Sequence, residues 1–246
     1  MKAGIQNPIN LQVNASLLPD FDVTGTEARH LVTLPDSDIK VHSQVLTPLI
    51  GLMDKASAAG FDMRVASGFR SFERQLTIWN NKANGLRPVL DAEGWPIDLN
   101  SLSDDEKVYA ILRWSALPGA SRHHWGTDVD VYDASRMPEN YQLQLTVEET
   151  EDDGPFAEFH RWLSQELQAQ ELQECPQDFF RPYVPGAGSI SPEPWHLSYA
   201  PLARIFATQL TEDTLREKLR VTDIALKESV LKNLGEIYQH YIKPYQ

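Results

Sequence analysis

Two histidine-bearing segments of the chain carry the residue types that hydrolytic chemistry at a metal ion requires. The first segment holds the adjacent histidines His123 and His124 and ends on Asp130. The second places Glu193 three residues before His196. A catalytic zinc site uses three protein ligands, an open position for water and a nearby base. Two imidazoles and a carboxylate, with a further carboxylate beside one imidazole, are the components of such a site.

Each of these residues also has an ordinary structural interpretation. A histidine beside a tryptophan is more often packed and hydrogen-bonded than bound to a metal, and aspartates that alternate along a strand usually form its solvated face. The joint occurrence of the two segments is what favours a metal site. For the four remaining histidines we expect structural roles: His30, His42, His160 and His240.

The elements that must position these residues are two short strands. Alternation over 127–132 predicts a strand with Asp128 and Asp130 on one face and its valines on the other. Gly126 lets the chain fold back, so that His123 and Asp130 can converge. Residues 195–199 form the second predicted strand, on which His196 projects away from the neighbouring apolar side chains.

The rest of the chain predicts an α+β fold, because helical and strand patterns are mixed without a regular alternation. Pro48 interrupts the first helical pattern, so that helix either kinks there or starts anew with Thr47 as its cap. The acidic run 148–153 is expected to be a solvated loop. Further strands are expected at 31–34 and 61–67, and helices from Asp38 to Gly60, from a Ser71 cap, at 103–115, at 155–173 and within 201–246.

The composition of the chain excludes some classes of binding partner. The 246 residues include 22 Lys+Arg and 35 Asp+Glu, a formal net charge of −13, which argues against a nucleic-acid binder and against attraction to an anionic membrane. The single cysteine, Cys175, excludes an internal disulfide and a cysteine-rich metal cluster, and we expect it to be a structural thiol. The chain shows neither a membrane-spanning apolar run nor a signal peptide, so a soluble chain without an export signal is expected.

Three ordered motifs resemble the VanY-type D-alanyl-D-alanine carboxypeptidases, zinc peptidases that share their fold with the hedgehog signalling domain. The pattern S-x-H-x-x-G-x-x-x-D begins at Ser121, and the pattern E-x-W-H-x-x-Y begins at Glu193. A third segment, S-G-F-R-S at 67–71 followed by Gln75, is similar to another element of the family. The resemblance covers about residues 40–200. It implies a small antiparallel sheet that carries the zinc site and is flanked by helices.

The resemblance also assigns roles by position. It implies one zinc ion held by His123, Asp130 and His196, with Glu193 as the general base. The family register selects His123 rather than His124 as the ligand.

Three further positions match residues that act on the substrate in the family. Arg70 would bind the substrate or stabilise the oxyanion, while Ser121 and Gln75 would contact the substrate. Asp128 is a departure, since the family usually has a small residue there. This additional carboxylate could raise the pKa of the base, pair with Arg70 or alter the metal preference.

The resulting hypothesis is a zinc metallopeptidase that removes the last residue of D-Ala-D-Ala-type peptidoglycan stem peptides or muropeptides. Alternatives are an endopeptidase that cuts inside the stem and a non-catalytic zinc-bearing binding module, which would not need both Glu193 and Arg70. Family members usually act in the cell envelope, which contrasts with the missing export signal. We expect an N-terminal arm over 1–36, the peptidase domain over 37–200 and a helical extension over 201–246 packed on that domain.

Overall fold

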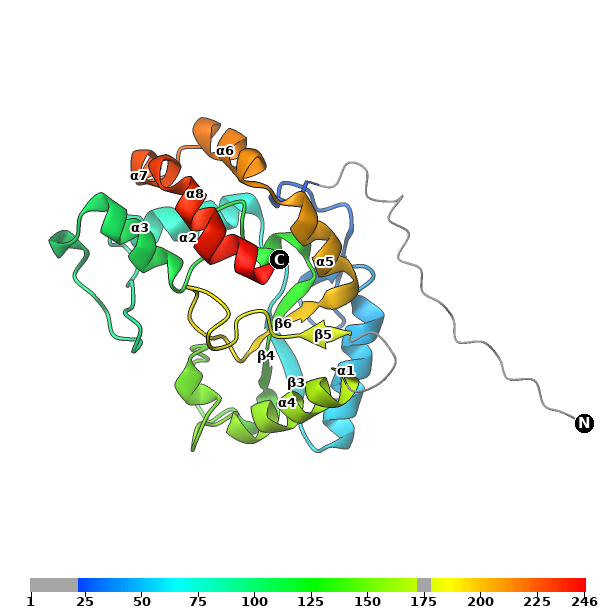
Figure 1. Cartoon of the computed structure of the whole chain (residues 1–246). Helices are drawn as coiled ribbons and strands as arrows, with labels where there is room; N and C mark the ends of the chain where they lie inside the picture. Colours follow the sequence, from blue (N-terminus) through cyan, green and yellow to red (C-terminus); the bar gives the residue numbers. More distant parts are fainter. Residues whose placement is uncertain (1–21, 172–177) are drawn as a thin grey trace, which may run out of the picture.

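A four-stranded antiparallel sheet lies at the centre of the computed structural model, in which residues 22–171 and 178–246 are described (Figure 1). The strand order is β3-β4-β6-β5. Most of the N-terminal arm and Cys175 fall outside the described residues. The predicted α+β fold with a small antiparallel sheet is confirmed. The four strands are β3 (Met63–Ser67), β4 (Asp128–Asp133), β5 (Phe179–Phe180) and β6 (His196–Tyr199).

Eight α-helices surround this sheet within the described ranges. Figure 1 shows α6, α7 and α8 gathered with α2 and α3 at one end of the sheet, and α4 at the other. None of the helices in the described part of the chain has the length and hydropathy needed to cross a membrane. The helices are α1 (Leu46–Ala58), α2 (Phe72–Ala83), α3 (Asp104–Leu112), α4 (Ala157–Glu171), α5 (Ala200–Gln209), α6 (Glu212–Val221), α7 (Lys227–Lys232) and α8 (Leu234–Ile237).

Short 3-10 and π segments complete the described chain. The one that matters for the site is η3 (Arg122–Trp125), which leads through Gly126 into β4. Gly126 has φ +68°, and a Cβ there would lie 2.8 Å from the backbone nitrogen of His42, so this turn requires glycine. The predicted fold-back is therefore confirmed. The others are η2 (Leu99–Ser101), η4 (Ala134–Arg136), η5 (Val147–Glu149), η6 (Tyr238–Ile242) and η7 (Lys243–Tyr245).

The first predicted helix begins later than expected. Residues Lys40–His42 form strand β2, which pairs with β1 (Leu31–Thr33), and the helix starts only at Leu46. The helical spacing of the apolar residues was misleading here, because the pairing with β1 buries Val41 completely. Pro48 lies in the first turn, where its missing N–H is not needed.

The caps of two helices confirm their predicted starts. The Ser71 hydroxyl accepts a hydrogen bond from the backbone N–H of Arg74 at 3.2 Å. Ser103 forms a capping box with Glu106. The acidic run 148–153 differs from expectation at two positions, because Glu149 and Thr150 are buried. Glu149 accepts a hydrogen bond from the backbone N–H of Gln144 at 2.8 Å.

The two faces of the central strands divide as the alternation predicted. Val129 and Leu197 pair across β4 and β6 and are fully buried in the hydrophobic core. On the other face, Asp130 pairs with His196 and Asp128 with Ser198. Because directly paired residues point to the same side of a sheet, this register brings the acidic and imidazole side chains together.

Candidate metal centre and its surroundings

Three of the predicted site residues converge from three elements. His123 comes from η3, Asp130 from β4 and His196 from β6, and one donor atom from each lies within 4.8 Å of the others. The His123 Nε2 is 3.4 Å from Asp130 Oδ2, and the His196 Nδ1 is 3.2 Å from Asp130 Oδ1. All three side chains are buried.

Two donor atoms at this point lack hydrogen-bond partners. Asp130 Oδ1 and His196 Nδ1 are both buried and unsatisfied. A buried polar atom without a partner is unfavourable, and a cation placed between these atoms would satisfy both. Two imidazole nitrogens and one carboxylate form a donor set that suits zinc and leaves one position open. The residues therefore fit a catalytic zinc ion.

His123 is oriented by the turn that follows β3. Its Nδ1 lies 2.8 Å from the carbonyl oxygen of Gly68, which can only accept, so Nδ1 carries the hydrogen. The Nε2 lone pair is then left for a metal. Burial lowers the pKa of His123 to about 3, although Asp130 opposes the shift, and the ring is neutral at physiological pH.

The neighbouring His124 forms hydrogen bonds with backbone groups through both of its ring nitrogens. Its Nδ1 lies 2.6 Å from the carbonyl of Arg70, and its Nε2 accepts from the N–H of Gly119 at 3.1 Å. Both ring nitrogens are thus occupied. This arrangement agrees with the register that selects His123 over His124.

Asp128 holds the opposite edge of the His196 ring. Its Oδ1 lies 3.0 Å from His196 Nε2 and 2.9 Å from the Nε of Arg122. Burial raises the pKa of Asp128, but Arg122 and His196 together hold that pKa well below its usual range. A carboxylate on the far nitrogen of a ligating histidine fixes its tautomer and orientation. Asp128 therefore lies behind His196 and pairs with Arg122, not with Arg70.

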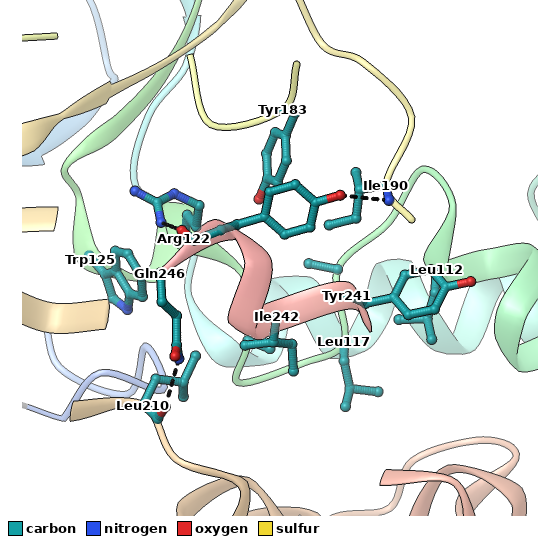
Figure 2. Close-up of a pocket in the computed structure, with 13 residues that line it drawn as sticks. Leu112, Leu117, Arg122, Trp125, Tyr183, Ile190, Leu210, Tyr241, Ile242 and Gln246 are labelled. Atoms are coloured by element: carbon teal, nitrogen blue, oxygen red, sulfur yellow. Dashed lines mark hydrogen bonds between the residues drawn. The ribbon is translucent and has the colours of Figure 1, made fainter. Parts of the chain in front are cut away.

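Arg122 ties this arrangement to the C-terminal part of the chain. Its guanidinium donates to the Ser198 hydroxyl at 2.6 Å and to the backbone carbonyl of Tyr245, and it lies over the Trp125 ring at 4.8 Å. Figure 2 shows Arg122 at the edge of the pocket near Trp125 and Gln246. The free volume there is about 20 Å³, room for about one water molecule, so this pocket is packed rather than open to a ligand.

Replacing Asp128 by asparagine is expected to lower the affinity for zinc by about 10- to 100-fold, because His196 loses the carboxylate that orients it. Zinc affinity measured by competition with a chromophoric chelator tests this expectation. Asp105→Asn is the control, since that partly exposed carboxylate pairs with Lys232 and Asn233 at the end of α7. Equal zinc affinity in the wild type and Asp128→Asn would contradict the proposed support.

Glu193 lies beside the Nδ1 edge of the His196 ring, whereas Asp128 lies at the Nε2 edge. Its Oε2 is 3.4 Å from His196 Nδ1, and its backbone N–H donates to the Tyr183 carbonyl at 3.0 Å. Burial raises the pKa of Glu193, while His196 opposes the shift. The Tyr183 ring packs edge-on against His196 with centroids 4.8 Å apart. A carboxylate with a raised pKa at this position is suited to accept and return a proton.

Two of the three predicted substrate residues, Arg70 and Gln75, come from the segment that follows β3. Arg70 donates to Gln75 Oε1 at 2.9 Å, and the Gln75 amide donates in turn to the Ala116 carbonyl at 2.7 Å. Gln75 is fully buried, so it holds Arg70 in place. Ser121 is also buried and begins η3, where its carbonyl accepts from the N–H of His124 at 3.0 Å.

Two charged residues of this region were not predicted from the sequence. Arg122 stands between Ser121 and His123, but two of its partners, Ser198 and Tyr245, come from distant segments. Lys82 follows Gln75 by seven residues, two helical turns, which is a spacing that could have identified it. Burial and the charges of Arg87 and Arg70 lower the pKa of Lys82 to about 8, although Glu193 opposes this shift. The charge of Lys82 therefore interacts with that of the candidate base.

The chain is similar to a described protein family and to several known proteins. Residues 38–202 match the family described as VanY, D-alanyl-D-alanine carboxypeptidase. An uncharacterized protein of Haemophilus influenzae is 45% identical over 104 residues, which are 41% of this chain and 70% of that protein. The chain is also similar to VanYB in complex with D-alanine-D-alanine (24% identity, 80% and 92% of the two chains, TM-score 0.49). A mutant of the vancomycin resistance D,D-pentapeptidase VanY in complex with Zn(II) gives 23% identity, 83% and 92% coverage, and a TM-score of 0.48.

Proposed function

Because the chain belongs to the VanY family of D-alanyl-D-alanine carboxypeptidases, we propose that it is a zinc-dependent peptidase that removes the terminal residue of D-Ala-D-Ala-type peptidoglycan stem peptides. The observation that carries this proposal is the convergence of Asp130 Oδ1 and His196 Nδ1, both unsatisfied, with Glu193 beside them. Such an arrangement supplies a metal position and a base in one place.

The proposed chemistry divides between the metal and the side chains. Zinc held by His123, Asp130 and His196 would act as a Lewis acid and lower the pKa of a water molecule to about 7. Glu193 takes a proton from the attacking water and later returns it to the leaving amine. Its raised pKa makes Glu193 a stronger base than an ordinary glutamate, which favours the first of these transfers.

Arg70 provides the means to recognise a chain end. A guanidinium can bind a terminal carboxylate through two parallel hydrogen bonds, and Gln75 holds this one in position. Lys82 adds a second positive charge that interacts electrostatically with Glu193. The net charge of the protein is negative, so these local cations, together with the metal, must attract an anionic peptide.

Metal analysis combined with a peptide screen tests the proposal. The purified protein is expected to hold one zinc per chain and to convert a stem pentapeptide ending in D-Ala-D-Ala into the tetrapeptide and free D-alanine. A chelator should stop the reaction, and zinc should restore it. Cleavage inside the stem would instead identify an endopeptidase. A folded protein that cleaves none of the tripeptide, tetrapeptide and pentapeptide would contradict the proposed peptidase and favour a binding module.

A further inference from the structure

A second pocket lies beside the candidate base and is not used by the proposed chemistry. It has a volume of about 440 Å³ and is formed by helix α4 and the segment that leads into β6. Pro192 and Pro194, the neighbours of Glu193 in the sequence, line it, as does Tyr183. Because Tyr183 also packs against His196, this pocket adjoins the candidate metal centre. In Figure 1 the same segment runs between β6 and α4.

Arg181 is the notable residue of this pocket. Its guanidinium donates to the Ser164 hydroxyl at 2.5 Å and to the His160 carbonyl at 3.3 Å, while its Nε is buried without a hydrogen-bond partner. Among the side chains that the structure describes, no carboxylate lies within ion-pair distance of Arg181. Burial lowers the pKa of Arg181 to about 10, which still leaves it charged at neutral pH.

His160 provides a second unsatisfied group in the same wall. Its side chain is 3% exposed, and its Nε2 is buried without a hydrogen-bond partner. Burial and the charge of Arg181 lower the pKa of His160 to about 3, so the ring is neutral. A neutral imidazole can donate one hydrogen bond to an anion.

A partly buried cation without a counter-charge, such as Arg181, is costly to the fold unless a ligand supplies the missing charge. We propose that this pocket binds a carboxylate of the substrate on the acyl side of the scissile bond, with Arg181 as its counter-ion and His160 as a second donor. This inference rests on the proposed function, in which Arg70 receives the opposite end of the peptide. It extends recognition from the chain terminus to an acidic residue upstream of the cleaved bond.

The rim of the pocket favours a peptide carboxylate over a phosphate. Glu151 and Asp152 also line the pocket, and both are exposed. Their charges are screened by solvent, but they disfavour a group with more than one negative charge. A single carboxylate that reaches the partly buried Arg181 avoids this repulsion.

Binding of matched peptides to the zinc-loaded Glu193→Ala protein tests the inference without requiring hydrolysis. The probes are pentapeptides ending in D-Ala-D-Ala that carry a carboxylate or a carboxamide at the second or the third residue. Calorimetry should show about 10-fold or greater preference for the carboxylate at one of these positions. In the same background, Arg181→Gln should abolish that preference, and Arg181→Lys should retain part of it. Arg136→Ala, which removes an exposed surface arginine, should leave the preference unchanged.

The outcomes separate this subsite from the proposed peptidase activity. Equal binding of carboxylate and carboxamide peptides by the Arg181-containing protein would overturn the subsite, whether or not the wild type cleaves them. An equal loss of affinity for both peptide types in Arg181→Gln and Arg181→Lys would also overturn it, because that result indicates a purely structural arginine. Displacement of the carboxylate peptide by millimolar inorganic phosphate would overturn the preference for carboxylate over phosphate.

Discussion

Replacing Glu193 by alanine is expected to lower kcat for a D-Ala-D-Ala pentapeptide by about 10²–10⁴-fold, to the point where hydrolysis is lost in ordinary assays. The reason is geometric, since Glu193 lies 3.4 Å from His196 Nδ1 and no other described carboxylate occupies its side of the ring except Asp130, the expected ligand. The zinc content should stay at one ion per chain. Turnover and metal content measured on the same sample provide the test.

Two companion variants make this result specific. Glu193→Gln keeps the volume of the side chain and removes only its ability to accept a proton, so it should lose as much activity as the alanine variant. Glu148→Ala removes an exposed glutamate and should change neither turnover nor zinc content. Loss of zinc in Glu193→Gln would place Glu193 among the ligands and undo its assignment as the base.

Replacing His196 by alanine is expected to release the metal and abolish activity together. The variant removes one of three expected ligands and leaves Asp128 and Asp130 buried without the imidazole between them. Zinc content should fall well below one per chain after dialysis, whereas the Glu193→Ala protein should retain its zinc. Metal analysis by mass spectrometry measures the difference.

The matched control for this variant is His240→Ala, which removes an exposed histidine from the C-terminal segment. It should keep both zinc and activity. Far-UV circular dichroism should establish that His196→Ala remains folded, because a misfolded sample would lose zinc for a trivial reason. Stoichiometric zinc in a folded His196→Ala protein would contradict the ligand set.

The alternation of β4 and β6 made the arrangement of the site predictable. A strand places every second residue on one face, so Asp128 and Asp130 lie on the same face of β4. The residues of β6 that pair with them, Ser198 and His196, lie on that face too. The Asp130–His196 pair is the direct result. The α+β class followed from the same local patterns, which the structure confirms.

The role of Asp128 could not be predicted in this way. Its partners include Arg122 and His196, and the sequence does not indicate that the Arg122 guanidinium binds Asp128 instead of pointing to solvent. Tertiary contacts decide this, since Arg122 is also held by Ser198 and by the Tyr245 carbonyl. Sequence spacing carries no information about such distant partners.

The start of α1 was predicted wrongly for a similar reason. Val41 fits a helical spacing with the apolar residues that follow, but pairing between β1 and β2 gives its backbone another set of hydrogen bonds. The strand β5 was missed because two residues, Phe179–Phe180, are too few to show a period. In both places the pairing partner, not the local pattern, determines the structure.

The contact between Arg122 and the Tyr245 carbonyl has a consequence for the order in which the site is assembled during synthesis. All three expected ligands lie at or before His196, and Tyr245 follows roughly fifty residues later, a few seconds of translation at about 5–20 residues per second. A nascent chain that has exposed β6 therefore carries every donor atom for the metal. It does not yet carry the Tyr245 carbonyl that holds Arg122. Because Arg122 holds Asp128 and Asp128 orients His196, the orientation of His196 is completed last.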